Sequence, residues 1–256
     1  MNILTIAGNT FKESARDRIF YVLLVFAIVM LLCSKAIGWI GLDEVKITQD
    51  FSLTTIWFFG VIIAIYVGTG LVYKEIDKKT IYTVLSKPVE KYEFILGKYI
   101  GLLLMLFVNI LIMCAIFLAY HWLTLGRPSL RLPLAVFLIY LELVFITAMA
   151  MMFGSMASPI LSAVFTFCMF VAGHCSDAYM LLAERAQKFH QPVSGNLFRF
   201  FYWVMPNLTF FDIKSRAVQP TLPLVAKDIV LPIGYCVIYS AILITISLFF
   251  FKRRNF

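Results

Sequence analysis

Charged residues are scarce in this sequence. Asp, Glu, Lys and Arg make up 14% of the 256 residues, whereas 62% are hydrophobic; soluble domains contain about a quarter charged residues. The apolar residues come in long blocks, and a block of about eighteen or more residues can cross about 30 Å of hydrocarbon as a helix. The short alternating segments that are typical of a membrane β-barrel are missing. The composition therefore predicts an all-α integral membrane protein.

Catalytic motifs are also missing. The chain has only 3 histidines and contains no H-E-x-x-H, paired-Asp or Ser-His-Asp pattern. A phosphate-binding G-x-x-x-x-G-K-[ST] loop is absent too, because Tyr99 follows Gly97-Lys98. The 5 cysteines form no CxxC pair, which argues against a disulfide framework. We expect no catalytic site in this chain and no cofactor bound to it.

The apolar blocks predict about six membrane-spanning helices in a single transmembrane domain, residues 1–256. Residues 2–17 precede the first span, and the predicted apolar helix face there is Ile3, Leu4, Ala7, Phe11 and Ala15, as in an interfacial amphipathic helix. The connection 183–228 is rich in Phe, Tyr and Trp, which favours re-entrant or interfacial helices packed against the bundle. The expected spans are about Ile19–Ile40, Leu53–Tyr73, Phe94–Trp122, Leu134–Met156, Ile160–Leu181 and Ile229–Phe251.

Basic residues are distributed unevenly around these spans. The N-terminal segment, the loop after the second span and the C-terminal tail together hold twelve Lys and Arg, whereas the short loops on the opposite side hold three. Such an excess marks the cytoplasmic side, so both termini are predicted to be cytoplasmic. The net charge of +8 therefore fits topology and anionic lipid contact better than nucleic-acid binding.

One stretch, Tyr73 to Gly101, reads YKEIDKKTIYTVLSKPVEKYEFILGKYIG. It leaves the membrane after the second span and returns at the third. The pattern at its centre predicts a short helix with a mainly apolar stripe along one face. Pro88 is expected to end this helix. A stripe of this kind fits a groove in a soluble protein or the lipid headgroups, and the residues alone leave both alternatives open. The side chains of the stripe are Thr80, Ile81, Val84 and Leu85.

The same stretch resembles the coupling loop of the type-2 ABC exporter permeases. In that family a Glu follows span two, a Thr comes a few residues later, and a Leu-rich turn leads to Ser-x-Pro-Val and a Gly-Lys that enters span three. Many members have Gly before the Thr, where this chain has Lys79. The branch with Thr-Ile and Ser-Lys-Pro-Val resembles permeases often labelled multi-copper enzyme maturation components. The matching residues are Glu75, Thr80, Leu85, Ser86, Pro88, Val89, Gly97 and Lys98.

The resemblance implies an N-terminal interfacial helix, six spans, and re-entrant helices between spans five and six. It also implies half of an export pathway in a prokaryotic inner membrane, surrounded by lipid and paired with a second permease. A separate ABC ATPase subunit would bind ATP and Mg and contact the coupling loop, residues 74–93. Two alternatives stay open: a non-transporting anchor or assembly subunit of an ABC complex and, less favoured, a membrane-embedded enzyme. The coupling residues would be Glu75, Lys79, Thr80, Ile81, Val84, Leu85, Ser86 and Pro88.

Three polar residues inside predicted spans form a candidate pathway set. An ionisable group at membrane depth costs roughly 2.5–3.5 kcal/mol on insertion scales. Lys35 lies late in span one, where its side chain can snorkel to the interface. Glu142, near the middle of span four, would be protonated, paired with Lys35, or exposed to a hydrated pathway. Asn109 in span three fits interhelical hydrogen bonding or a place on the pathway.

Soft metal ligands gather in spans four and five. They suit copper, but methionines in an apolar helix usually serve packing, so we favour packing and assign no metal site. His174 and Asp177 are expected to share a helical face and to hydrogen-bond to each other. The candidate ligands are Met149, Met151, Met152, Met156, Cys168, His174, Cys175 and Asp177.

Overall fold

The computed structural model describes residues 3–38, 43–77, 91–125, 131–189, 192–218 and 226–253. Within these ranges the chain forms helices and no strand, so the predicted all-α class is confirmed. The helices are α1 Ile3–Ala15, α2 Arg18–Gly38, α3 Glu44–Asp77, α5 Lys91–Leu125, α6 Arg131–Met156, α7 Pro159–His174, α8 Ser176–Lys188, α9 Pro192–Val204, the 3-10 turn η1 Thr209–Phe211, α10 Lys214–Val218 and α11 Lys227–Arg253.

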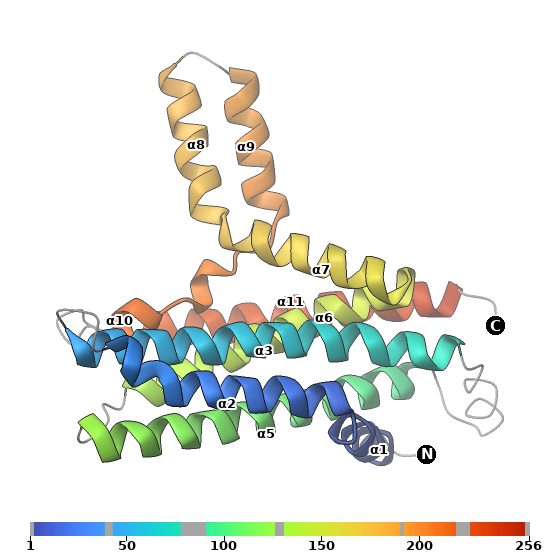
Figure 1. Ribbon diagram of the computed structural model, residues 1–256. Coiled ribbons are helices and arrows are strands. Elements are labelled where there is room, and N and C mark those ends of the chain that lie inside the picture. The colour runs from blue at the N-terminus through green and yellow to red at the C-terminus, as the bar shows by residue number, and fades with distance from the viewer. Residues whose placement is uncertain are drawn as a thin grey trace.

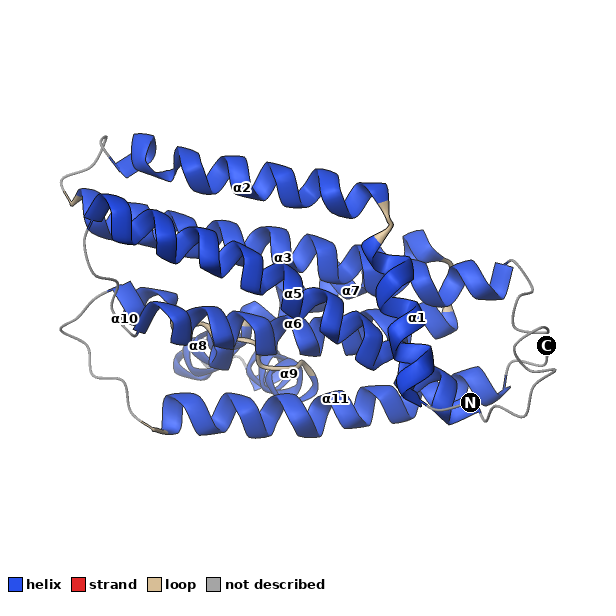
Figure 2. Cartoon of the chain, turned by 90° about the horizontal axis from the view of Figure 1, so that it is seen from below, coloured by secondary structure: helices blue, strands red, loops and turns tan. Residues whose placement is uncertain are grey.

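Five long helices, α2, α3, α5, α6 and α11, run side by side as a bundle (Figures 1 and 2). Both chain termini, the end of α3 and the start of α5 lie at one end of the bundle, here called the terminal end; the opposite end is the distal end (Figure 1). The most apolar window of α6 is 72% buried, against 24% for α2 and 22% for α11. Helix α6 is therefore the centre of the bundle, and α2 and α11 present most of their apolar surface outward.

The described helices account for most of the predicted spans. Five of them are long and apolar enough to cross a membrane, and the bent pair α7–α8 would make a sixth. Helix α3 begins at Glu44 instead of at Leu53, because the polar residues before the apolar run continue the same helix. The chain is thus a multi-pass integral membrane protein.

The predicted span Ile160–Leu181 is not one continuous helix, because the helix breaks at Cys175. Helices α7 and α8 meet there at an angle of 57°. The carbonyl of Gly173 accepts hydrogen bonds from the backbone N–H of Leu208, at 3.2 Å, and from the hydroxyl of Ser176, at 2.8 Å. A Cβ at Gly173 would lie 2.8 Å from the carbonyl oxygen of Pro206. A segment more than thirty residues further along the chain therefore packs against the bend and supplies its hydrogen bonds.

The connection 183–228 divides into two parts. Helices α8 and α9 form an antiparallel hairpin that stands away from the bundle (Figure 1), so the expected packing against the bundle does not extend to them, and a re-entrant or interfacial placement stays a prediction. The elements η1 and α10 do pack on it, against α6, α3 and α11. The hairpin is held by its own interior, where Ala183 and Ala186 are buried near Gly195.

Helix α1 crosses α5 at two glycines four residues apart, Gly97 and Gly101. A Cβ at Gly101 would lie 2.6 Å from the backbone oxygen of Ala7, and a Cβ at Gly97 would lie 2.7 Å from the Cβ of Ile6. A side chain at either position would hold the two backbones apart, so the crossing needs glycine.

The N-terminal helix is therefore confirmed, but the face predicted to be apolar is only partly the face that packs. The buried side chains of α1 are Ile6, Ala7, Thr10 and Ser14. Leu4 is 77% exposed. The difference arises because the packing of α1 on α5 buries two small polar side chains, Thr10 and Ser14. Helical periodicity alone does not predict that these polar residues are buried.

We expect Gly101→Ala to destabilise the docking of α1, because the added methyl would overlap the backbone of Ala7. Overpacking of this kind costs about 1–3 kcal/mol, which should lower the midpoint of thermal unfolding in detergent. The matched control is Gly234→Ala in α11, where a Cβ meets no atom within 4 Å. Equal midpoints for the two variants would contradict the close crossing.

Candidate functional site

A carboxylate lies buried at the centre of the bundle. Glu142 of α6 is 1% exposed. The indole N–H of Trp57, from α3, donates to both carboxylate oxygens at 3.0 Å. His174, the last residue of α7, places its Nε2 3.4 Å from Oε1 of the same carboxylate. Side chains from three helices, α3, α6 and α7, thus meet at one buried carboxylate, and we call Trp57, Glu142 and His174 the Glu142 cluster.

The two nitrogens of His174 show how the cluster is protonated. Nδ1 lies 3.2 Å from the carbonyl oxygen of Phe170, and a carbonyl only accepts, so Nδ1 carries a hydrogen. Nε2 makes no hydrogen bond among the described residues, and it faces Oε1 of Glu142. Two unprotonated atoms in that position would repel, so the pair holds one further proton, on Nε2 or on the carboxyl group. In either form the pair is neutral overall, which reduces the cost of burying it.

Trp57 links the cluster to the connection between α9 and α11. Its ring lies 5.6 Å from that of Phe170 and 5.5 Å from that of His174, measured between centroids. The ammonium of Lys214, from α10, lies 3.8 Å from the centroid of the indole ring, a cation–π contact. The same ammonium lies 3.8 Å from a carboxylate oxygen of Asp212. The short helix α10 is therefore anchored on α3 through one lysine.

A cavity of about 570 Å³ lies beside the Glu142 cluster. His174 is part of its wall, so the imidazole lies between the cavity and the buried carboxylate. The volume falls in the range of about 300–1,000 Å³ typical of small-molecule sites. The walls come from the α7–α8 bend, η1, α10 and the start of α11. The charged residues that line it are Asp177, Asp212, Arg216, Lys227 and Asp228.

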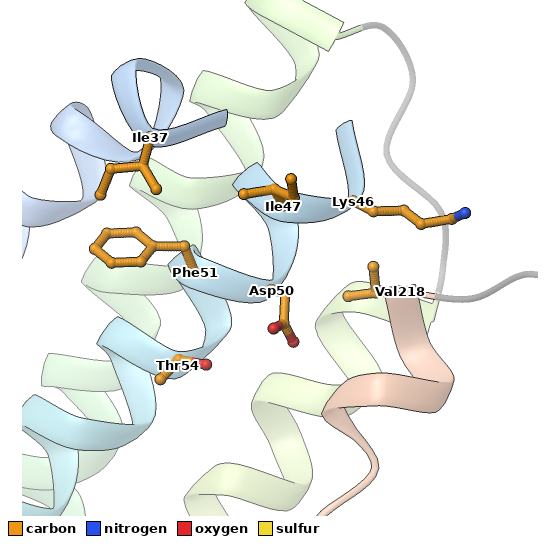
Figure 3. Close-up of a pocket in the computed structure, with 7 residues that line it drawn as sticks. All are labelled: Ile37, Lys46, Ile47, Asp50, Phe51, Thr54 and Val218. Atoms are coloured by element: carbon orange, nitrogen blue, oxygen red, sulfur yellow. The ribbon is translucent and has the colours of Figure 1, made fainter. Parts of the chain in front are cut away.

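A second hollow of about 460 Å³ lies at the distal end, between α2, α3 and Val218 of α10 (Figure 3). Figure 3 shows the carboxylate of Asp50 directed into the space between α3 and α10, while Lys46 extends away from it. Lys46 pairs instead with Asp43, at 2.8 Å. The hydrogen bond from Lys46 lowers the pKa of Asp43 below its ordinary value. The rest of this hollow is mainly apolar, so it offers less polar chemistry than the cavity beside Glu142.

The structure tests the predicted pathway residues unequally. Glu142 is buried and partnered, whereas the side chain of Lys35 lies outside the described residues, so their pairing stays a prediction. Asn109 is fully buried, and neither amide atom has a hydrogen-bond partner among the described residues. The expected interhelical hydrogen bond is therefore not seen in the part of the chain that is described.

The predicted coupling residues stay predictions as well. Glu75 lies in α3, but its side chain is not among those described. The others fall between α3 and α5, outside the described residues: Lys79, Thr80, Ile81, Val84, Leu85, Ser86 and Pro88.

Sequence reasoning missed Trp57 and a second buried polar pair. Gln49 of α3 and His121 of α5 meet at 2.7 Å between their Nε2 atoms. Each of these residues sits in or beside an apolar run, and its partner lies far along the chain, so no local pattern marks it. The one available signal was rarity: the sequence has 3 His and 4 Trp, so Trp57 and His121 stand out by residue type alone.

The gathered soft ligands form no metal centre in the described part of the chain, where no group of three or more His, Cys, Asp and Glu side chains has a suitable arrangement. Met149 and Met151 are buried in the core. The expected hydrogen bond between His174 and Asp177 is wrong. The break at Cys175 puts the two residues in different helices, and His174 contacts Phe170 and Glu142 instead.

The long apolar helices of the described chain define a helical, multi-pass membrane protein. The family model described as ABC-2 family transporter protein matches residues 4–256, so the chain belongs to that family. It is a membrane permease of an ABC transporter. No individually curated protein matches the chain. The resemblance to the type-2 ABC permeases is thereby confirmed, while the narrower multi-copper maturation branch stays a prediction.

We expect Glu142→Leu to destabilise the fold, because it leaves the Trp57 N–H without an acceptor in a buried place. The expected loss is about 1–3 kcal/mol, measured as a lower thermal midpoint in detergent. Glu142→Gln is the matched control. Its amide oxygen accepts from Trp57, and its N–H₂ donates to Nε2 of His174. If the two variants unfolded at the same temperature, the hydrogen-bonded cluster would not contribute to stability.

Proposed function

We propose that this permease forms half of an export pathway, pairs with a second permease, and is driven by a separate ATPase subunit. The observation that carries the proposal is the family match over residues 4–256, which spans almost the whole chain. The absence of a phosphate-binding loop from the sequence supports a separate energy source, with ATP and Mg on the ATPase. The whole chain, residues 1–256, is then one permease domain.

The ATPase contact lies in the coupling loop, residues 74–93. Helix α3 ends at Asp77 and α5 begins at Lys91, both at the terminal end, which supports a partner that binds at that end. The apolar stripe of this loop suits a groove in the ATPase. Glu75, Lys79 and Ser86 would add polar contacts around it, and Pro88 would end the helix.

The terminal end faces the cytoplasm of a prokaryotic cell, and the protein lies in the inner membrane. The excess of Lys and Arg on the segments at this end supports the orientation. An ATPase that depends on cytoplasmic ATP would then bind on the same side as both termini.

The Glu142 cluster borders the transport pathway. The imidazole of His174 lines the cavity and lies 3.4 Å from this carboxylate. A buried, neutral Glu–His pair suits a wall that must change its hydration when the pathway opens. Lys35 and Asn109 stay in the proposed pathway set, with less support from the structure.

The test is purification of the tagged full chain from its native cells in mild detergent, followed by identification of the proteins that co-elute. We expect an ABC ATPase, which is lost in Leu85→Asp and in Thr80→Arg because both changes disrupt the apolar stripe. A second permease that co-elutes would distinguish a heterodimer from a homodimer.

Leu123→Asp provides the matched control. Leu123 is 87% exposed near the distal end of α5, so an aspartate there should leave the ATPase bound. If all three variants retained the ATPase, the coupling loop would not be its binding site. If the unchanged chain brought down no ATPase under several gentle conditions, a stand-alone membrane protein would become the better explanation.

A further inference from the structure

The start of α11 forms one side of the cavity beside the Glu142 cluster. Helix α11 begins with Lys227 and Asp228, and its apolar run follows directly, within the candidate span Lys227–Phe251. Charged residues immediately before a span mark the headgroup boundary. Leu231 and Pro232 lie one turn further in, and all four residues line the cavity. The cavity therefore extends from the headgroup region into the hydrocarbon.

The charges around the cavity are arranged in pairs, with one charge of each sign left over. Arg216 and Asp228 form an ion pair at 3.0 Å. Lys214 and Asp212 face each other at 3.8 Å. Asp177 and Lys227 both line the cavity, and neither forms an ion pair with another described residue. The cavity thus presents one carboxylate and one ammonium, which complement a ligand with a positive and a negative group.

The remaining walls suit an apolar tail. Phe210, Ile213, Leu231 and Pro232 line the inner part of the cavity. Leu231 is also 43% exposed on α11, so the cavity continues onto the outer face of that helix. Further along this face, two turns on, Ile238 is 61% exposed. A ligand with its polar group in the cavity would have a continuous apolar surface for its chains.

We propose that this cavity binds the headgroup of a zwitterionic phospholipid that carries a primary ammonium, the chemistry of phosphatidylethanolamine. The ammonium lies on Asp177, the phosphate lies on Lys227, and the acyl chains run along α11. The inference goes beyond the permease function and does not depend on an ATPase.

Other membrane lipids fit less well for reasons of charge. An anionic phospholipid without an ammonium would bring its phosphate to Lys227 but leave the carboxylate of Asp177 without a partner beside a second negative group. A cationic amphiphile would bring its positive group to Asp177 but leave the ammonium of Lys227 without a partner beside a second positive group. Only a zwitterion satisfies both residues at once.

The test measures thermal unfolding of the delipidated full chain in detergent, with added phosphatidylethanolamine or phosphatidylglycerol. A ligand that binds the folded state raises the midpoint. We expect a larger rise with phosphatidylethanolamine. Asp177→Asn should abolish this preference, and Lys227→Gln should reduce the rise with both lipids. Glu184→Gln and Lys188→Gln are matched controls on exposed positions of α8 outside the cavity lining, and they should keep the preference.

Two results would overturn the proposal. One is an equal rise with both lipids in the unchanged chain; the other is a preference that survives Asp177→Asn. Soluble glycerophosphoethanolamine carries the same headgroup without acyl chains, so it tests whether the chains contribute to binding. If it shifted the midpoint as much as the lipid, the occupant would be a free zwitterion and the lipid assignment would be wrong. Because the assay contains no ATPase, these results are independent of the co-purification test.

Discussion

Hydrocarbon offers no hydrogen-bond partner, and the architecture follows from that constraint. Each long helix satisfies its backbone groups internally, so the bundle can be assembled from apolar surfaces alone. The chain leaves helical geometry inside the protein only where other groups replace the lost bonds. At the α7–α8 bend the carbonyl of Gly173 is satisfied by Leu208 and Ser176, and the hydroxyl of Tyr235 accepts the N–H of Asn207 at 2.7 Å. The bend and the segment around Leu208 therefore stabilise each other.

The same constraint governs the side chains. Glu142 is tolerated at the centre of the bundle because Trp57 donates to both of its oxygens and the imidazole of His174 lies 3.4 Å away. Gln49 and His121 satisfy each other in a comparable way between α3 and α5. Asn109 differs from them, since both of its amide atoms are buried without a partner in the described chain. An unsatisfied amide of this kind costs about 1–3 kcal/mol.

The sequence predicts the long helices well because the signal is strong and local: a run of apolar residues must be helical to cross lipid. It also identifies Glu142 as unusual, because a carboxylate inside an apolar run is costly. It does not reveal the break after His174, since that break depends on Pro206 and Leu208, which reach it through the fold. For the same reason the partners of Glu142 cannot be read from the sequence. Trp57 lies in an apolar run where a tryptophan is ordinary, and only the packing of α3 on α6 brings it to the carboxylate.

The crossing of α1 over α5 has a mechanical consequence. At Gly97 and Gly101 the backbone of α5 lies directly against α1, close to the backbone oxygens of Ile3 and Ala7, and α5 contributes no side chain at these two positions. The crossing lies only a few residues after the start of α5, and α1 connects directly to α2. A displacement of the start of α5 would therefore meet α1 at close range, with no α5 side chain at the crossing to yield first. Removing α1 would remove this contact between the start of α5 and the segment that leads into α2.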